Sequence, residues 1–125
     1  MLGDKRAIAT IPVKNIENAK GFYEGVLGLT NLFEDSSGVL YQSGNSQVFV
    51  YTSPFASSNK ATAATWAVGQ DLESIIEKLK AKGITFETYD VPGTITEGIL
   101  HINGNLKEAS FLDLDGNSLS LINIE

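Results

Sequence analysis

The stretch "ASFLDLDGNSLSLI", residues 109–122, places a short polar turn between two apolar segments. Its central "DGNS", residues 115–118, supplies glycine and asparagine, which tolerate the positive φ angles that reverse a chain between antiparallel strands. A related turn, "SGNS" at 43–46, lies between "GVLYQ" and "QVFVY". Both stretches therefore predict β-hairpins, and their turn glycines, Gly44 and Gly116, are 72 residues apart (116 − 44).

Each hairpin is preceded by a strand and a helix, and the start and stop signals of the two helices are separated by almost the same number of residues. Asn15 is the predicted cap of a first helix that Gly28 ends, and Asp71 is the predicted cap of a second helix that Gly83 ends. The caps are 56 residues apart (71 − 15), and the glycines are 55 apart (83 − 28). The chain therefore contains two copies of a strand–helix–hairpin unit.

We expect one domain, 1–125, built from repeat units at about 1–53 and 62–125 and joined by the small, polar segment 53–62. The turns are farther apart than the caps, so the second unit holds about 16 extra residues (72 − 56) between its helix and its final hairpin. This insertion lies near 89–105. It is either a functional lid or a longer surface hairpin, and the sequence leaves both open.

Composition narrows the class of protein. The chain has 125 residues, 42% of them hydrophobic, and no cysteine, which excludes disulfides, thiol catalysis and thiolate metal sites. The formal net charge of −6 makes a nucleic-acid partner a poor expectation. No apolar run is long enough for a membrane span or a secretory signal, so we expect no membrane partner and a cytoplasmic protein.

The paired βαβββ pattern, the helix "NIENAKGFYEGVLGL" at 15–29 and the final "ASFLDLDGNSLSLI" resemble the vicinal oxygen chelate superfamily, which includes glyoxalases, bleomycin-resistance proteins and extradiol dioxygenases. The resemblance implies an α+β fold in which two curved mixed sheets surround a concave pocket, and it implies a homodimer. Leu114 departs from the family pattern, which usually has proline there; we expect this to change the stiffness of the turn only.

The resemblance also implies where a divalent metal would be held in the metalloenzymes of this superfamily. Carried onto this chain, the four ligand positions are Ile8, Val48, Ala64 and Ser120. Three of these side chains have no donor atom, and a serine hydroxyl is a weak ligand. The single histidine, His101, lies in the insertion. We therefore predict no metal, no other cofactor and no catalytic residue.

The two-residue period of strands gives a predicted pocket wall. This wall combines three groups. The first consists of residues that share a strand face with an implied metal position, the second is the residue paired with Ser120 in the final hairpin, and the third is the single histidine. The predicted ligand-binding residues are Thr10, Val48, Val50, Trp66, His101, Phe111, Ser120 and Ile122. Each also has a structural interpretation, in particular Trp66 as a core residue and His101 as a solvated side chain.

Three functions remain open. The first is a metal-independent small-molecule binding protein that sequesters a toxic or drug-like compound, the partner being a small molecule. The second is a glyoxalase-like lyase or isomerase, or a dioxygenase-related enzyme, with an atypical site such as His101 with the Glu97 carboxylate. The third is a protein-interaction module without catalysis, which a large exposed apolar patch would favour. Of these three, the sequence favours a function without catalysis.

Overall fold

The computed structural model consists of two compact units, Met1–Ser58 and Asn59–Glu125, each with one mixed sheet and its own helical segment. This confirms the α+β class and the two βαβββ units predicted from the sequence. No helix among the described residues is long and apolar enough to cross a bilayer. The structure describes residues 1–58, 60–87, 94–96 and 98–125.

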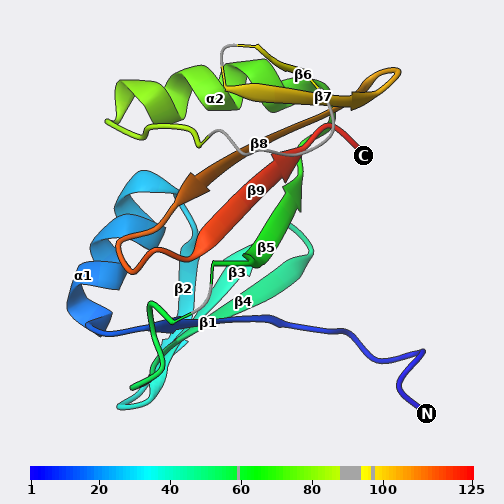
Figure 1. Cartoon of the computed structure of the whole chain (residues 1–125). Coiled ribbons are helices and arrows are strands. Elements are labelled where there is room, and N and C mark those ends of the chain that lie inside the picture. The colour runs from blue at the N-terminus through cyan, green and yellow to red at the C-terminus, as the bar shows by residue number, and fades with distance from the viewer. Residues whose placement is uncertain (59, 88–93, 97) are drawn as a thin grey trace. The chain divides into compact units, whose positions relative to one another are not determined.

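Unit 1 follows the order strand, helix and three strands (Figure 1). Its sheet, which we call sheet 1, has the order β1-β4-β3-β2; β1 is parallel to β4, and the other neighbours are antiparallel. The elements are β1 (Ala9–Val13), helix α1 (Ile16–Lys20), the π-helical segment η1 (Gly21–Val26), β2 (Thr30–Glu34), β3 (Gly38–Ser43) and β4 (Ser46–Thr52).

The first helix begins and ends where the sequence predicts. The Asn15 side chain accepts a hydrogen bond from the Asn18 N–H at 2.9 Å, which satisfies one of the unpaired donors of the first turn. Gly28, with φ of +76°, follows the helix, as its predicted stop requires. The π-helical segment was not predicted: its turn widens so that the Leu27 N–H donates to the Phe22 carbonyl, five residues back, at 3.0 Å.

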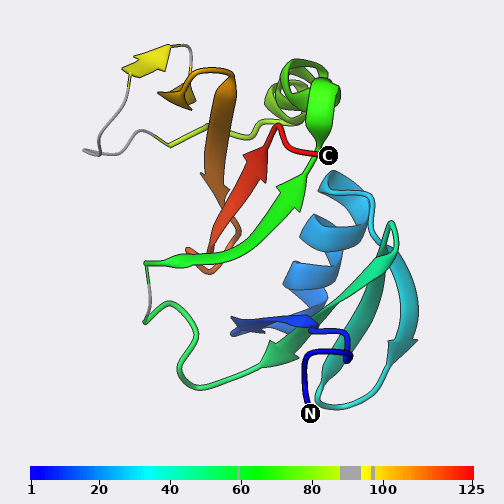
Figure 2. The ribbon, with the colours of Figure 1, turned by 90° about the vertical axis from the view of Figure 1, so that its right-hand side faces the viewer.

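We call the side of sheet 1 that packs against α1 and η1 its helix face, and the other side its distal face (Figure 2). The Tyr23 and Tyr41 rings stack across the helix face with centroids 6.1 Å apart. The centre of this face is apolar and buried, and burying each large side chain contributes roughly 1.5–3 kcal/mol. The strand residues in this core are Ile11, Val13, Val39, Tyr41, Val48 and Val50.

Unit 2 repeats this order with one additional strand. Its sheet, which we call sheet 2, has the order β5-β9-β8-β7-β6 with β5 parallel to β9. The additional strand, β6, forms an antiparallel hairpin with β7 inside the predicted insertion; residues 88–93 and 97 of that insertion lie outside the described part of the chain. The elements are β5 (Thr62–Ala67), the 3-10 turn η2 (Gly69–Asp71), α2 (Leu72–Ala81), β6 (Thr94–Thr96), β7 (Ile99–Asn103), β8 (Leu106–Leu112) and β9 (Ser118–Ile122).

The second helix also has the predicted limits. Asp71 occupies the cap position, although its side chain makes no capping bond; the Ser74 hydroxyl donates to the Asp71 carbonyl at 3.0 Å. Gly83 follows the helix with φ of +92°. The Lys107 ammonium of β8 lies 3.3 Å from the Glu73 carboxylate of α2, which identifies the helix face of sheet 2 as the side that carries Lys107.

On β8 and β9, the helix face of sheet 2 is apolar after Lys107. Because side chains alternate along β8, Ala109 and Phe111 share the side of Lys107. The register of β9 on β8 pairs these two residues with Leu121 and Leu119. All four are buried, as are the core residues of α2, which are Leu72, Ile76 and Leu79.

The two hairpin turns differ in length although their sequences are related. Ser43 pairs with Ser46, so the first turn has two central residues, and Gly44 has the positive φ of +58° that a type II′ turn requires at its first central position. Leu112 pairs with Ser118, so the second loop has five residues, 113–117. The buried Asp113 carboxylate holds this loop by accepting hydrogen bonds from the backbone of Asp115 and Asn117 and from the Asn117 amide.

Candidate ligand-binding face

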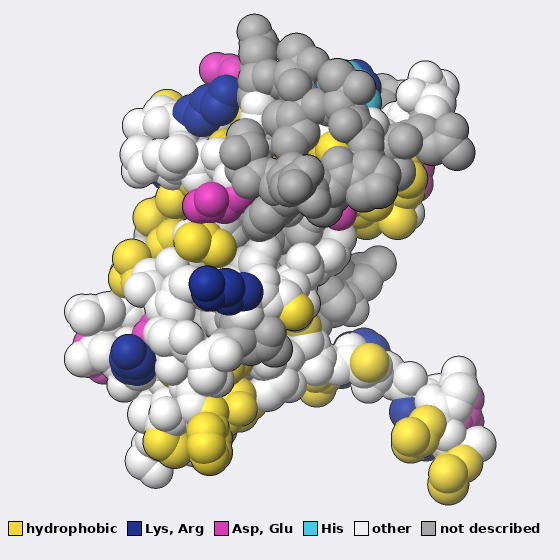
Figure 3. Space-filling view, in the orientation of Figure 1, with side chains coloured by type: hydrophobic (Ala, Val, Ile, Leu, Met, Phe, Trp, Pro, Cys, Tyr) yellow, Lys and Arg dark blue, Asp and Glu magenta, His cyan; other side chains and the backbone are white. Residues whose placement is uncertain are grey.

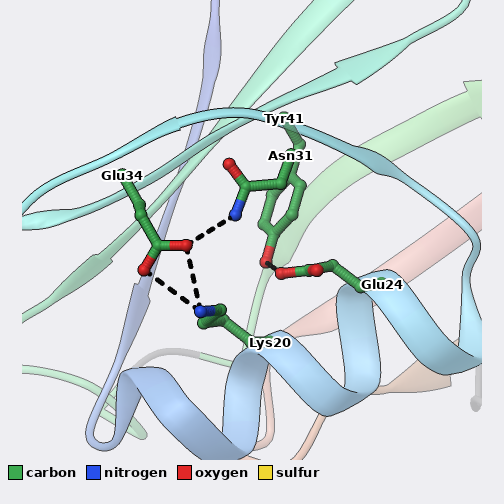
Figure 4. Close-up of polar contacts among 5 residues, drawn as sticks. All are labelled: Lys20, Glu24, Asn31, Glu34 and Tyr41. Carbon is green, nitrogen blue, oxygen red and sulfur yellow. Dashed lines mark hydrogen bonds and ion pairs between the residues drawn. The ribbon is translucent and has the colours of Figure 1, made fainter.

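A polar network fixes α1 on the helix face of sheet 1 (Figure 4). The Lys20 ammonium donates to both oxygens of Glu34, at 3.0 and 3.1 Å, and the Asn31 amide donates to Glu34 at 2.8 Å. The hydrogen bond from Lys20, followed by that from Asn31, lowers the pKa of Glu34, and the same bond to Glu34 raises the pKa of Lys20. Glu34 therefore stays ionised and engaged, so it is not positioned as a general base.

Tyr41 forms the second part of this network (Figure 4). Its ring is fully buried, and its hydroxyl donates to the Glu24 carboxylate at 2.9 Å. Burial first, and the bond to Glu24 second, raise the pKa of Tyr41, because both favour the neutral phenol. The hydroxyl therefore remains a protonated donor. We interpret the network as structural: it attaches the helix to β2 and β3.

Two predicted ligand-binding residues, Val48 and Val50, lie in the core instead of on the distal face. The register of β1 on β4 pairs Ile11 with Val50 and Thr10 with Phe49. The predicted face sharing of Thr10 with Val48 and Val50 is therefore wrong. Val48 is 72 residues before Ser120 (120 − 48), the separation of the two turn glycines. The two turns differ in length, so this separation does not preserve the register, and a register change of one residue exchanges the two faces of a strand.

Sheet 2 requires a similar correction. Phe111 pairs with Leu119, whereas Ser120 pairs with Ser110, so the predicted proximity of Phe111 to Ser120 on one face is wrong. Trp66 pairs with Leu121 after an irregularity in the register between Thr62 and Ala64. Trp66 and Phe111 therefore lie on the helix face, together with the buried leucines of β9.

His101 also lies on the helix face of sheet 2, directly across from Lys107 in the β7–β8 register. The Glu73 backbone N–H first, and the bond from Lys107 second, lower the pKa of the Glu73 carboxylate, to which His101 adds a smaller attraction. The histidine thus lies near the ion pair of Lys107 and Glu73, beside α2. Glu97, its proposed catalytic partner, lies outside the described residues.

The remaining predicted residues lie on distal faces. Thr10 is exposed on β1, and its hydroxyl donates to the Ile8 carbonyl at 3.1 Å. Ser120 is fully buried, with its oxygen 3.3 Å from that of Ser110. Ile122 is half-buried at the end of β9, on the same side of the strand as Ser120. Whether these residues contact a ligand stays a prediction.

The distal face of sheet 1 carries a mainly apolar row, of which only Thr10 is among the predicted ligand-binding residues. Phe33, Leu40, Phe49 and Thr10 are successive partners across β2, β3, β4 and β1. Neighbouring strands lie about 4.8 Å apart, so the row extends for roughly 14 Å. Phe33 is 60% exposed, and Leu40 and Phe49 are half-buried. The alternation in "GVLYQ" and "QVFVY" identifies these positions once the register is known.

Two aromatic rings and a glycine give this face its shape. The Phe49 and Tyr51 rings are parallel within 5°, with centroids 5.9 Å apart. Gly38 is the β3 partner of Tyr51, and a Cβ atom there would lie 2.3 Å from the Val50 carbonyl and 3.1 Å from the Phe49 ring. A side chain at position 38 would therefore clash with the backbone of β4 and also press on the ring of Phe49.

No charged residue occurs among the described strand residues of this distal face. The side chains are apolar, aromatic, hydroxyl or amide groups. They are Thr10, Pro12, Thr30, Phe33, Gly38, Leu40, Gln42, Gln47, Phe49 and Tyr51. Such a surface can hold an organic ring by apolar contact and stacking.

The distal face of sheet 2 has different chemistry. Its central strands carry three buried serines, Ser110, Ser118 and Ser120, and Thr65 is the β5 partner of Ser120. Hydroxyl groups can donate and accept hydrogen bonds but provide little apolar area.

The residues at the implied metal positions do not fit a divalent metal. Ile8 and Ala64 have no donor, and the register places Val48 in the core. Gln47 occupies the distal face at the start of β4, where its amide oxygen accepts from Arg6. Within the described residues, no three His, Asp or Glu side chains gather closely enough to hold a metal ion. These residues therefore do not suit metal-dependent catalysis.

Charged side chains are scattered over the surface that Figure 3 presents and do not form a continuous patch there. Among the described residues, the ion pairs Lys5–Asp4, Lys20–Glu34 and Lys107–Glu73 are all at least partly exposed. Surface pairs of this kind contribute little to stability.

A comparison with known families decides the classification. The sequence model of the Glyoxalase/Bleomycin resistance protein/Dioxygenase superfamily matches residues 6–121. This chain belongs to that superfamily. The resemblance seen in the sequence is thereby confirmed. A search of curated protein sequences finds no significant match.

Several solved structures share the fold of this chain. A bleomycin-binding protein in complex with bleomycin is 21% identical, with a TM-score of 0.72 over 97% of this chain and 99% of that chain. The fosfomycin resistance protein FosX from Listeria monocytogenes, complexed with Mn(II) and sulfate, is 12% identical, with a TM-score of 0.73 over 98% and 91%. An integron cassette protein from the metagenome of the Halifax Harbour sewage outfall is 18% identical, with a TM-score of 0.71 over 96% and 99%.

Proposed function

We propose that this superfamily member is a metal-independent binding protein for a small molecule, which it holds on the distal face of sheet 1. The observation that carries the proposal is the uncharged row from Phe33 through Leu40 and Phe49 to Thr10. Partly exposed aromatic and aliphatic side chains on neighbouring strands offer contact area for an organic ring without requiring a metal. Sequestration of a toxic or drug-like compound is the use that we propose for such binding.

Two further observations support this function over metal catalysis. The implied ligand positions lack suitable donors, as Ile8 and Ala64 illustrate. The Glu24 carboxylate accepts a hydrogen bond from the buried Tyr41 hydroxyl on the helix face, so it is already engaged. The bleomycin-binding protein, whose fold this chain shares, is a precedent for ligand binding on this architecture.

The test uses the uncharged fluorescent probe N-phenyl-1-naphthylamine with the full chain in excess chelator. We expect saturable binding that does not change when Mn²⁺, Zn²⁺ or Ni²⁺ is added. Phe49→Ala should weaken this binding about tenfold, because it removes one stacking ring. The matched control is Leu114→Ala, which truncates a 65% exposed leucine in the β8–β9 loop and should leave the affinity unchanged. A requirement for metal, or equal binding by the Phe49 variant, would overturn the proposal.

We also propose that the chain forms a homodimer. The resemblance to the superfamily implies a homodimer, and β1 and β5 are edge strands of their sheets, a position that favours association with another chain. Size-exclusion chromatography with light scattering should give twice the chain mass of 13.4 kDa. A clean monomer at micromolar concentration would end this proposal.

A further inference from the structure

We infer that the ligand of the distal face is a flat aromatic compound carrying one anionic group, which Arg6 binds at the edge of the face. This inference rests on the proposed function, because it assigns a chemical class to the ligand of that same face. It depends on the position of one guanidinium group relative to the apolar row.

Arg6 is held at the start of the face by Gln47. Its Nη2 donates to the Gln47 amide oxygen at 3.2 Å, and Gln47 is half-buried on β4, two residues before Phe49 and on the same side of the strand. Two residues along a strand span about 6.6 Å, which is close to the length of a fused two-ring system. A ring that lies on Phe49 therefore brings its substituent to the guanidinium.

The guanidinium retains donors for such a substituent. Arginine has five N–H donors in a planar fork, and the bond to Gln47 uses one of them. No ion pair to Arg6 occurs among the described residues. A carboxylate matches the geometry of the fork and can accept two parallel hydrogen bonds.

Two polar groups of the face already donate to backbone carbonyls. The Thr10 hydroxyl donates to the Ile8 carbonyl, and the Gln42 amide donates to the Gly44 carbonyl at 2.5 Å. A second charge on the ligand would meet no oppositely charged side chain among the described strand residues of the face, and burying an unpaired charge is costly. The face therefore favours one anionic group at the Arg6 end and an uncharged ring beyond it.

The experiment compares three probes with one ring system: 2-naphthoate, the neutral 2-naphthamide and the cationic 2-naphthylmethylammonium. Each is titrated into the full chain at low salt, with binding located by NMR shift changes at Leu40 and Phe49. An exposed ion pair contributes about 1 kcal/mol, so naphthoate should bind about fivefold more tightly than naphthamide. High salt should reduce this preference, because it screens exposed charges.

Two variants, each of which removes one positive charge, complete the test. Arg6→Gln should remove the preference for naphthoate, whereas Lys5→Gln, the adjacent exposed cation, should preserve it within about twofold. Equal binding of naphthoate and naphthamide at Leu40 and Phe49, or an unchanged preference in Arg6→Gln, would overturn the ligand class and leave the proposed function standing. Absence of any shift at Leu40 and Phe49 with all three probes would overturn both.

Discussion

The two sheets share one topology, but their distal faces differ in chemistry. Sheet 1 presents an apolar row that includes Phe33 and Phe49, whereas sheet 2 presents a hydroxyl cluster that includes Ser110 and Ser120. Their helix faces differ less, since both are apolar cores with a lysine–glutamate pair at the margin. A repeated βαβββ unit thus conserves the side that packs on the helix and leaves the other side free to change.

The largest expected effect is a difference in stability between truncating an aromatic residue of the core and truncating one of the distal face. Phe111→Ala should lower the free energy of unfolding by about 3–5 kcal/mol, because Phe111 is buried against Phe86 and the second helix face. Phe49→Ala should cost less than half as much, because its ring is partly exposed. Urea unfolding of both variants measures the difference. Equal losses would contradict the assignment of the two rings to different environments.

The next effect concerns the loop that distinguishes the second hairpin from the first. Asp113→Ala should lower the free energy of unfolding by about 2–3 kcal/mol, because it leaves the backbone N–H groups of Asp115 and Asn117 without their acceptor. Thermal and urea denaturation can measure this loss. Asp35→Ala serves as a comparison, since Asp35 accepts similar bonds from Ser37 in an exposed turn of unit 1. A loss for Asp113→Ala no larger than for Asp35→Ala would show that the five-residue loop does not depend on its buried carboxylate.

A smaller effect tests the network that holds the first helix. Tyr41→Phe should cost about 1 kcal/mol at neutral pH, the contribution of one hydrogen bond. Because folding raises the pKa of Tyr41, its contribution is fully present below about pH 10 and is lost as the pH rises through the folded-state pKa. The stability of the wild type should therefore fall above about pH 10, and this part of the fall should be missing in Tyr41→Phe.

The control for this alkaline effect is Tyr51→Phe, which removes a hydroxyl from the distal face of the same sheet. Urea denaturation at a series of pH values gives both profiles. If Tyr41→Phe and the wild type lost stability in parallel, the buried hydroxyl would not be the group that titrates.

The smallest effect belongs to the hydroxyl cluster of sheet 2. The Ser110 and Ser120 oxygens are 3.3 Å apart, which is long for a bond between two hydroxyls, so Ser120→Ala should change the free energy of unfolding by only about 0.5 kcal/mol. Affinity for the naphthyl probes should not change, because we place their site on sheet 1. A large loss of affinity would move the site toward the serines.

The sequence was sufficient for the elements that depend on local chemistry. The Asn15 cap, the stops at Gly28 and Gly83 and the two turn glycines follow from side-chain hydrogen bonding and from positive φ angles, which neighbouring residues determine. The repeat of these signals, together with the motifs at both ends of the chain, predicted the fold class.

The site could not be predicted as well, because it depends on register. One residue of shift moves Val48 from the distal face to the core and brings Phe49 to the surface in its place. The lengths of the two hairpin loops set that shift, and the related sequences "SGNS" and "DGNS" conceal a difference of three residues (5 − 2) between these loops. The irregular pairing near Ala64 has the same consequence for Trp66.

The most direct test of the central claim is an NMR titration of the isotope-labelled full chain with 2-naphthoate in the presence of excess chelator. The account predicts saturable shift changes at Thr10, Leu40 and Phe49 and little change at Val48 or Val50. Shift changes centred on Val48 and Val50, or binding that appears only after a divalent metal is added, would contradict it.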